Sequence, residues 1–394
     1  MTLRSGMHGL DEALRHAGVL ICAGTGGVGK TTVAAALALR AARSGRRTLV
    51  LTIDPARRLA DALGLEGLGS EATAVPYVGP GAAADFALDA MMLDPKPTFD
   101  GLVERLAPDA ATRVRVLDNR IYRHLSEALA GSAEYAALEQ VREAVESGRY
   151  DLVVVDTPPA SHALDFLSAP RRLRDFLEGR FVQSLVRPAM SAGRFGFRVF
   201  GQGLHRMMGL IERIAGGGFL DDLTEFLTSA ASLTEGFQAG TARVESILLG
   251  DDTRFVLVGG ARSGTEPGTL EFLDALDTEG ARLAAVILNR IAPWPADTDP
   301  DLPRGEAARA DRAALTAALA SAGVASPENQ AVLLETILTE AARSRLDLLE
   351  TRRQLARRVD LDRVDFHEIS ERSEEIGGLE GLLRIGDELV GEAA

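Results

Sequence analysis

The residues best suited to chemistry form a glycine-rich loop near the start of the chain. Residues 24–32 read GTGGVGKTT, after a short apolar run and before an alanine- and leucine-rich stretch. Glycines let backbone N–H groups point inward at phosphate oxygens, and the positive end of a helix dipole adds to the field. A strand, this loop and a helix are the context that a Walker A motif requires. We therefore expect the loop to bind ATP as its Mg²⁺ complex.

Two residues at the end of this loop have separate expected roles. Lys30 can reach the β- and γ-phosphates, and the Thr31 hydroxyl can coordinate Mg²⁺. The predicted nucleotide-binding residues of the loop are Gly26, Gly27, Val28, Gly29, Lys30, Thr31 and Thr32.

Three further polar residues end other apolar runs. Asp156 follows LVVV and is predicted to hold Mg²⁺ as a Walker B acid, although an Asp before prolines can also cap a turn. Asp54 follows RTLVLTI and is a candidate for orienting the attacking water, but it could equally be a helix N-cap. Asn289 lies at the end of the run AAVILNR. Its amide can both donate and accept hydrogen bonds, as recognition of adenine's edge requires. The alternative is that Asn289 is an ordinary turn residue.

The elements that position these residues follow from hydrophobic patterning. Short runs at 18–23, 47–53, 152–155, 255–258 and 283–288 are apolar without helical periodicity, as buried parallel strands are. Residues 30–44 are predicted to be a helix that ends before Gly45. The predicted fold class is α/β, a doubly wound and mainly parallel sheet with helices on both faces.

Helical periodicity dominates the middle of the chain, at 99–106, 109–129, 134–147, 171–186 and 220–249. We expect a nucleotide-binding core at 1–90 and 251–394, the latter with C-terminal helices, and a mainly helical insert at 91–250 that is interrupted by core residues 150–168. Within the insert, residues 191–219 are either an adaptable binding surface or a loosely packed core helix. The apolar residues that alternate with its glycines are Phe195, Phe197, Phe200, Leu204, Met207, Met208, Leu210 and Ile211.

Composition excludes several classes of function. The 394 residues include 57 acidic and 43 basic ones, and the resulting net charge of -14 disfavours nucleic acid and anionic lipid as partners. No signal peptide or membrane-length apolar run is seen, so we expect a cytoplasmic protein with at most peripheral membrane association. Cys22, the single cysteine, lies in an apolar run and is predicted to be buried, which excludes a disulfide within the chain and a zinc site of its own thiolates.

Four motifs together resemble the ArsA-type ATPases, a family that includes the arsenite-pump ATPase and the ATPase that guides tail-anchored proteins to membranes. They are GTGGVGKTT, TIDPARRLADALG, DTPPASHALDFL and ILNR, and the similarity covers most of residues 15–290. Within the family, the chain looks like one member of the paired ArsA-like ATPases of actinobacteria. The resemblance implies a deviant P-loop fold that works as a nucleotide-sandwich dimer. It assigns water positioning to Asp54, magnesium to Asp156 and adenine to Asn289, and it makes the insert a client-binding or effector region.

The chain departs from the family pattern at two positions. Thr25 stands where the family has a lysine that crosses the dimer interface, and Arg58 stands where it has an asparagine. Arg57 or Arg58 could replace the missing charge, or both could be solvated helix residues. The expected partner is therefore either a second copy or, as a heterodimer, a lysine-bearing paralogue, with an apolar protein as a possible client.

Two kinds of function remain after these arguments. The first is an ATPase whose nucleotide-driven closure controls the binding of a protein or apolar client. The alternative is a small-molecule kinase or ligase on the same core, for which no additional substrate motif is seen. Arsenite transport is disfavoured because trivalent arsenic needs several thiolates, and zinc-clasped targeting is disfavoured because a CxxC motif is absent.

Overall fold

The computed structural model describes most of the nucleotide-binding region and the C-terminal part of the chain. The described residues are 9–77, 86–123, 132–158, 165–172, 174, 222, 225–226, 228–229, 232–261, 267–292, 312–360, 363–371 and 378–390. Residues 191–219, predicted to be either a binding surface or a loosely packed core helix, lie outside these residues, and so does most of the predicted helix at 171–186.

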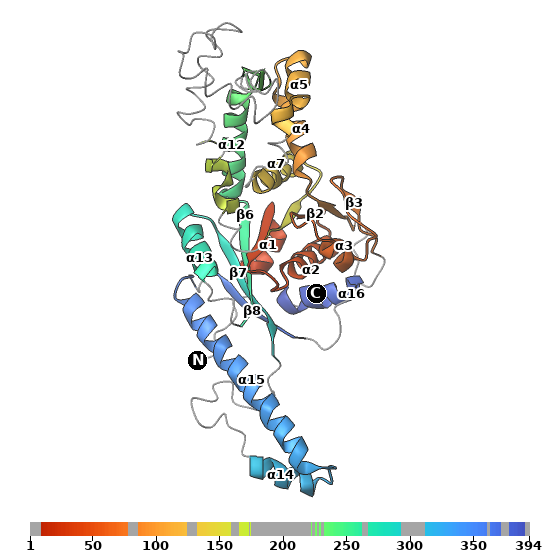
Figure 1. The fold of residues 1–394 in the computed structure, drawn as a ribbon, viewed down its shortest axis with the longest axis vertical. Coiled ribbons are helices and arrows are strands. Elements are labelled where there is room, and N and C mark those ends of the chain that lie inside the picture. The colour runs from red at the N-terminus through yellow and green to blue at the C-terminus, as the bar shows by residue number, and fades with distance from the viewer. Residues whose placement is uncertain are drawn as a thin grey trace, which may run out of the picture.

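An eight-stranded sheet forms the centre of the molecule (Figure 1), in the order β3-β4-β2-β5-β1-β6-β7-β8. All neighbouring strands are parallel except β3 and β4. The strands are β1 Val19–Gly24, β2 Thr48–Thr52, β3 Thr73–Ala74, β4 Leu88–Met92, β5 Leu152–Asp156, β6 Thr253–Gly259, β7 Leu283–Ile291 and β8 Asp365–Ser370. The five predicted strands are confirmed, and every residue of β1, β2 and β5 is buried, as strands covered on both faces require.

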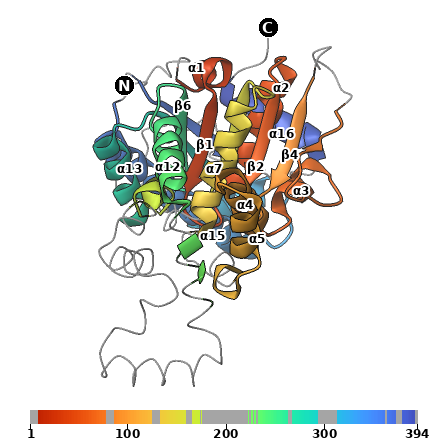
Figure 2. The same cartoon turned by 90° about the horizontal axis from the view of Figure 1, so that it is seen from above.

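Helices cover both faces of the sheet (Figure 2). On one face, the core includes residues of α1 Gly9–His16, α2 Lys30–Arg43, α3 Arg58–Leu63 and α16 Gly378–Val390. On the other, it includes residues of α7 Ser132–Glu146, α12 Thr234–Leu248 and α13 Pro267–Glu279. The predicted helix at 30–44 is confirmed, and Gly45 follows it with φ 87°, the left-handed conformation of a C-terminal glycine. The predicted α/β class is therefore confirmed.

A group of helices lies at the end of the molecule near the top of Figure 1. It includes α4 Pro95–Leu106 and α5 Ala110–Leu117, with α7 and α12 beside them. The prediction of one continuous helix over 109–129 is wrong, because the chain leaves the helix at Asp118 and Asn119. The Asn119 side chain accepts hydrogen bonds from the backbone N–H groups of Ile121 and Tyr122, and so caps a new helical turn.

Two helices that follow β7 extend in the opposite direction (Figure 1). They are α14 Arg312–Ser321 and the 30-residue α15 Pro327–Ala356. No helix in the described part of the chain is long and apolar enough to cross a membrane.

Candidate nucleotide-binding site

The glycine-rich loop lies at the carboxyl edge of the sheet, between β1 and α2. Gly24 is the last residue of β1, and a Cβ at this position would be 1.9 Å from the carbonyl oxygen of Val258 in β6. Gly27 and Gly29 have φ of 76° and 91°, in the left-handed region that favours glycine. A Cβ on Gly27 would meet nothing within 4 Å, so this part of the loop borders open space. Lys30 then opens α2, and the N-terminus of that helix faces the loop.

The Asp156 carboxylate is enclosed at the end of β5. Its Oδ2 accepts hydrogen bonds from the hydroxyls of Thr31, at 2.7 Å, and Thr52, at 3.0 Å. Its Oδ1 is buried and has no hydrogen-bond partner among the described residues. Burial raises the pKa of Asp156 to about 6, with a further contribution from Asp54, while the two hydroxyls and Lys30 oppose the rise. A carboxylate with one unused oxygen is thus held next to the Thr31 hydroxyl.

These oxygens suit Mg²⁺, which binds through one or two protein ligands together with water and substrate phosphates. The described residues contain no group of three His, Cys, Asp or Glu side chains that could hold a metal by itself. A magnesium ion here would therefore share its coordination between Thr31, Asp156 and a nucleotide phosphate. The unpartnered Oδ1 fits that arrangement.

Lys30 is folded back on the loop that precedes it. Its Nζ donates a hydrogen bond of 2.9 Å to the backbone oxygen of Thr25, and the residue is only 8% exposed. Burial lowers the pKa of Lys30, and the carboxylates of Asp156 and Asp54 act in the opposite sense. The Thr25 side chain is also buried, and its Oγ1 has no partner within the described part of the chain. The Thr25 side chain is thus enclosed by residues of its own chain.

Asp54 lies between β2 and α3, and it is not the N-cap of α3, which is Arg57. The Asp54 Oδ1 accepts from the backbone N–H of Ala56 at 2.9 Å, and Oδ2 pairs with the Arg58 guanidinium at 3.2 Å. Arg57 instead donates to the backbone oxygen of Glu66 at 2.7 Å. Of the two arginines, Arg58 is therefore the one that reaches an acidic residue of the site. Catalytic water positioning by Asp54 stays a prediction.

Asn289 contacts the loop directly, which the sequence did not reveal. Its Nδ2 donates to the backbone oxygen of Val28 at 2.8 Å, and its Oδ1 accepts from the backbone N–H of Arg290, whose φ is 57°. A Cβ on Gly29 would be 2.4 Å from the same Nδ2, so glycine is needed at that point. Asn289 thus fastens β7 to the loop, and its predicted role in reading adenine stays a prediction.

Threonines beside the two aspartates also belong to this site. Thr52 supports Asp156, and the Thr157 hydroxyl donates to the backbone oxygen of Cys22 at 2.8 Å. Their signal in the sequence is a position within two residues of an Asp at the end of an apolar run, in LTID and DTPP. Cys22 itself is fully buried in β1, as predicted, and burial raises the pKa of its thiol far above the ordinary value.

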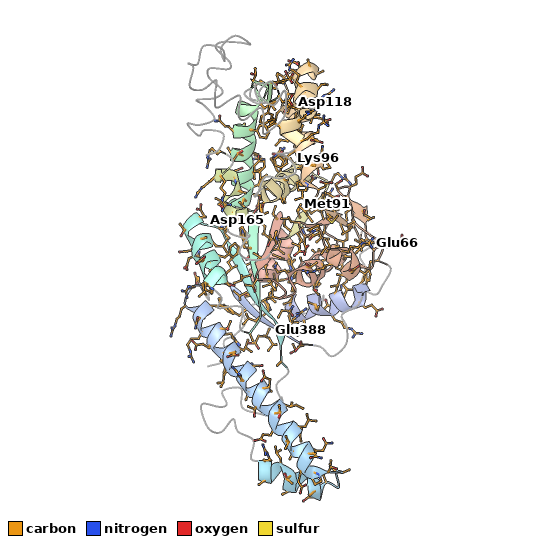
Figure 3. The ribbon with its side chains drawn as sticks, viewed as in Figure 1. Glu66, Met91, Lys96, Asp118, Asp165 and Glu388 are labelled. Carbon is orange, nitrogen blue, oxygen red and sulfur yellow. The ribbon has the colours of Figure 1, made fainter. Side chains whose placement is uncertain are left out.

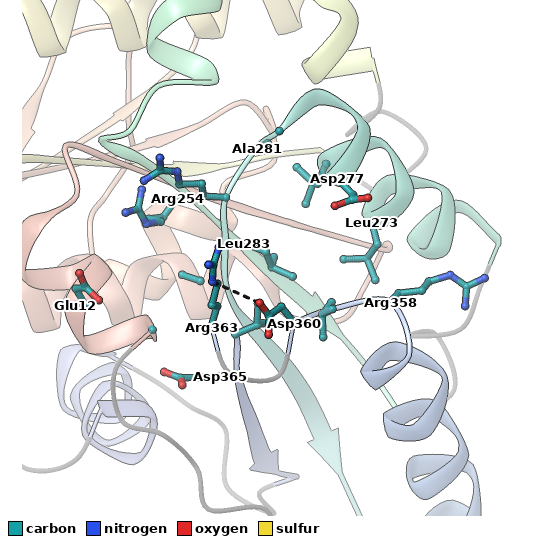
Figure 4. Close-up of a pocket in the computed structure, with 17 residues that line it drawn as sticks. Glu12, Arg254, Leu273, Asp277, Ala281, Leu283, Arg358, Asp360, Arg363 and Asp365 are labelled. Atoms are coloured by element: carbon teal, nitrogen blue, oxygen red, sulfur yellow. Dashed lines mark ion pairs between the residues drawn. The ribbon is translucent and has the colours of Figure 1, made fainter.

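A cavity of about 760 Å³ lies elsewhere, at the opposite edge of the sheet (Figure 4). Arg254, Leu283 and Asp365, which line it, belong to the amino ends of β6, β7 and β8. Some of its charged groups are engaged with neighbours: Arg363 pairs with Asp360 at 3.4 Å, and Asp365 accepts from the backbone N–H of Leu10 at 2.8 Å. Because it lies at the amino ends of the strands and none of the candidate nucleotide-site residues lines it, this cavity is separate from that site.

The parallel sheet, the loop between β1 and α2 and the carboxylate at the end of β5 define an α/β fold of the P-loop NTPase type. The family model described as anion-transporting ATPase, ArsA_ATPase, matches residues 17–299. The chain belongs to this ArsA family of P-loop ATPases, and the resemblance seen in its motifs is confirmed.

Proteins from several organisms are similar to the chain. It is 34% identical over 289 residues to the uncharacterized protein SCO2128 of Streptomyces coelicolor, covering 71% of this chain and 64% of that protein. It is 29% identical over 199 residues to the ATPase GET3 of Mycosarcoma maydis, covering 50% and 51% of the two chains. It is 31% identical over 155 residues to the ATPase ASNA1 homolog 1 of Paramecium tetraurelia, covering 37% and 42%. The chain thus spans less than two thirds of the length of each of these relatives.

Proposed function

We propose that this chain hydrolyses MgATP to ADP and phosphate. The observation that carries the proposal is the Asp156 carboxylate, which is bonded to the Thr31 hydroxyl and has one oxygen unused, beside a glycine loop and Lys30. Phosphoryl transfer needs mainly positioning and charge stabilisation, and this set of groups supplies both. The kinase alternative gains no additional acid, base or substrate site from the described residues near the loop.

Each residue has a defined task in the proposed reaction. Lys30 exchanges its hydrogen bond to the Thr25 carbonyl for the β- and γ-phosphates, while the loop amides bind the remaining phosphate oxygens. Thr31 and Asp156 would hold Mg²⁺, which when bound would neutralise phosphate charge. Asp54 orients water toward the γ-phosphorus, and for this its carboxylate has to share or give up the contact with Arg58.

Nucleotide binding is proposed to bring two chains together and to control a protein or apolar client. Support comes from family membership and from the Thr25 position, where this chain lacks a charge that it would otherwise offer to a partner. A lysine-bearing paralogue would supply that charge, and the isolated chain would then be a slow ATPase. Thr25→Lys should speed hydrolysis by a homodimer only if the new side chain can leave the buried Thr25 position and reach across the interface.

The test compares the only two lysines of the chain. Lys30→Ala should abolish ATP binding measured by calorimetry and hydrolysis measured by phosphate release. Lys96→Ala is the matched control, because Lys96 lies in α4, in the helical group (Figure 3), and pairs with Asp100 at 2.6 Å. Equal nucleotide affinity in wild type and Lys30→Ala would refute the proposed site. Normal binding with phosphate transfer to a metabolite and no hydrolysis would favour the kinase alternative.

A further inference from the structure

Two consecutive arginines follow Asp54 closely, and their side chains contact different parts of the molecule. The Arg57 guanidinium donates to the backbone oxygen of Glu66 at 2.7 Å, and Glu66 is an exposed residue at the periphery of the molecule (Figure 3). Arg58, the first residue of α3, instead pairs with the Asp54 carboxylate at 3.2 Å. The two residues have the same charge, but it is Arg58 that contacts a residue of the candidate site.

The Asp54 carboxylate has both of its oxygens engaged. Oδ1 accepts from the backbone N–H of Ala56 at 2.9 Å, and Oδ2 accepts from the Arg58 guanidinium. The backbone N–H of Asp54 donates to the Thr52 hydroxyl at 3.3 Å, and that hydroxyl donates to Asp156. These backbone contacts fix Asp54 beside the proposed magnesium site. Departure of the Arg58 side chain would leave Oδ2 of Asp54 for a water molecule alone.

Arg58 is suited to exchange one anion for another. Its side chain is 68% exposed, so little packing holds the guanidinium in place. An exposed ion pair of this kind contributes little to stability, and it can be given up for a stronger contact. A phosphate group offers that contact, because the planar guanidinium binds phosphate oxygens through two parallel hydrogen bonds.

The charge of Arg58 also acts on the loop that is expected to bind phosphates. The pKa of Lys30 is lowered first by burial, and the positive charge of Arg58 acts in the same direction. The carboxylates of Asp156 and Asp54 oppose this shift. Arg58 is therefore part of the electrostatic surroundings of Lys30, the residue expected to bind the β- and γ-phosphates. An anion bound at Lys30 would relieve the repulsion between the two cations.

We propose that Arg58 leaves Asp54 and binds the γ-phosphate when ATP enters the site, and that it thereby distinguishes ATP from ADP. The exchange leaves Oδ2 of Asp54 to orient the attacking water. The oxygen of that water bonds to the γ-phosphorus, the bond from the γ-phosphorus to the bridging oxygen breaks, and the bridging oxygen leaves with ADP. The protons of the water leave with the inorganic phosphate. This inference rests on the proposed ATPase function and adds to it the residue that contacts the third phosphate.

The first test is calorimetry of the full chain with MgADP and with the magnesium complex of an ATP analogue whose β–γ bridge is a non-hydrolysable nitrogen. Arg58→Ala should weaken binding of the analogue about tenfold or more, because hydrogen bonds between two charged groups are lost. It should leave the affinity for MgADP unchanged. Arg57→Ala is the matched control: it removes the same charge at the adjacent position, and it should change neither affinity.

Turnover and a conservative variant distinguish contact with phosphate from a structural role. Arg58→Ala should lower turnover at saturating ATP by roughly 10²-fold or more, since a cation on the transferred phosphate accelerates related reactions by about 10³ to 10⁵. Arg58→Lys should keep much of the preference for the triphosphate because it keeps the charge, and should recover less turnover because it lacks the planar guanidinium. If Arg58 only supports the start of α3, Arg58→Ala should instead weaken binding of MgADP and of the analogue equally.

A double-variant cycle tests the exchange between Asp54 and the phosphate. Asp54→Asn removes the anion that competes for Arg58, so it should tighten binding of the ATP analogue by about two- to fivefold. In the Arg58→Ala background the same change should give a smaller gain, because no guanidinium is then released. Equal gains in the two backgrounds would contradict the exchange.

Two further results would overturn the proposal. They are an Arg58→Ala variant that distinguishes the ATP analogue from ADP as well as wild type does, and an Arg57→Ala variant with the same effect as Arg58→Ala. Failure of the nucleotide site is a separate outcome, seen as normal nucleotide binding by Lys30→Ala. Loss of binding in Lys30→Ala together with an unchanged ratio of affinities in Arg58→Ala would refute this inference alone. The ratio requires no turnover, so it tests Arg58 even in a chain that hydrolyses no ATP.

Discussion

Replacing Asp156 with Asn should stabilise the ligand-free protein at neutral pH while removing its response to Mg²⁺. The carboxylate is 1% exposed, and its pKa is raised from the ordinary 3.8 to about 6. At pH 7 the folded protein therefore keeps a charge that its surroundings disfavour. The difference of roughly two pKa units corresponds to about 3 kcal/mol of unfolding free energy, at 1.36 kcal/mol per unit.

The sign of the pH dependence follows from proton binding. Between pH 3.8 and 6 the folded protein retains the Asp156 proton and the unfolded chain has released it. The contribution of Asp156 to stability is thus fully present below pH 3.8 and is lost as the pH rises through about 6. From pH 5 to pH 8 the loss amounts to about 1.4 kcal/mol. Asp156→Asn has no carboxyl group to titrate at this position. Its unfolding free energy relative to wild type should therefore rise by about 1.4 kcal/mol between pH 5 and pH 8.

The assay is urea unfolding of both proteins at pH 5 and pH 8, without nucleotide or metal. Asp151→Asn is the control: Arg47 lowers the pKa of Asp151 to about 2, so its contribution is lost only at pH values below this window. The relative stability of Asp151→Asn should therefore stay constant from pH 5 to pH 8. MgATP at a concentration one hundred times its dissociation constant should raise the unfolding free energy of wild type by about 2.7 kcal/mol. The same concentration should stabilise Asp156→Asn much less. If the difference in unfolding free energy between wild type and Asp156→Asn is the same at pH 5 and pH 8, burial does not raise the pKa of Asp156 and the reasoning is refuted.

Three further predictions concern the loop and its neighbours. MgATP should protect Lys30 but not Lys96 from acylation by an amine-reactive reagent, read by mass spectrometry; equal protection of both would place the nucleotide elsewhere. Asp54→Asn should keep ATP affinity within several-fold of wild type and lower turnover by roughly 10²-fold. Normal turnover in this variant would show that Asp54 has only the structural role given by its contacts with Ala56 and Arg58. Gly24→Ala should lower the unfolding free energy by about 3 kcal/mol or more, because its Cβ would overlap the Val258 carbonyl at 1.9 Å. Gly64→Ala is the control: Gly64 has φ 71°, and an added Cβ would meet nothing within 4 Å, so this variant should lose only about 1 kcal/mol of unfolding free energy. A similar loss in Gly24→Ala and Gly64→Ala would contradict the predicted overlap with Val258.

Sequence patterning predicted the centre of the sheet but missed its edges. The strands β1, β2 and β5 are buried on both faces, so their sequences are continuous apolar runs. In contrast, β8 reads DFHEIS and forms one edge of the sheet, where polar residues are tolerated. Near the other edge, β4, which lies between β3 and β2, carries Asp89, which accepts a hydrogen bond from the Tyr150 hydroxyl at 2.7 Å. That partner comes from a distant part of the chain, so the sequence around β4 gives no sign of it.

The same limit applies within the site. Asp156 and Thr31 could be placed together because carboxyl ends of parallel strands meet at one edge of the sheet. The bond from Asn289 to Val28 could not be predicted, since it depends on how β7 approaches the loop. The hydrogen bond from the Lys30 side chain to the backbone oxygen of Thr25, five residues earlier, could not be predicted either. These contacts arise from three-dimensional packing rather than from residue type or spacing.

The unsatisfied groups of the site share a physical explanation. Buried polar atoms normally have hydrogen-bond partners, and one that lacks them costs about 1–3 kcal/mol. Oδ1 of Asp156 and Oγ1 of Thr25 both lack partners among the described residues, and Lys30 is held in a buried position that lowers its pKa. A magnesium ion at Asp156 and phosphates at Lys30 would relieve two of these penalties at once. The destabilised ligand-free site thus favours nucleotide binding, and for this reason we expect Asp156→Asn to gain stability and lose function together.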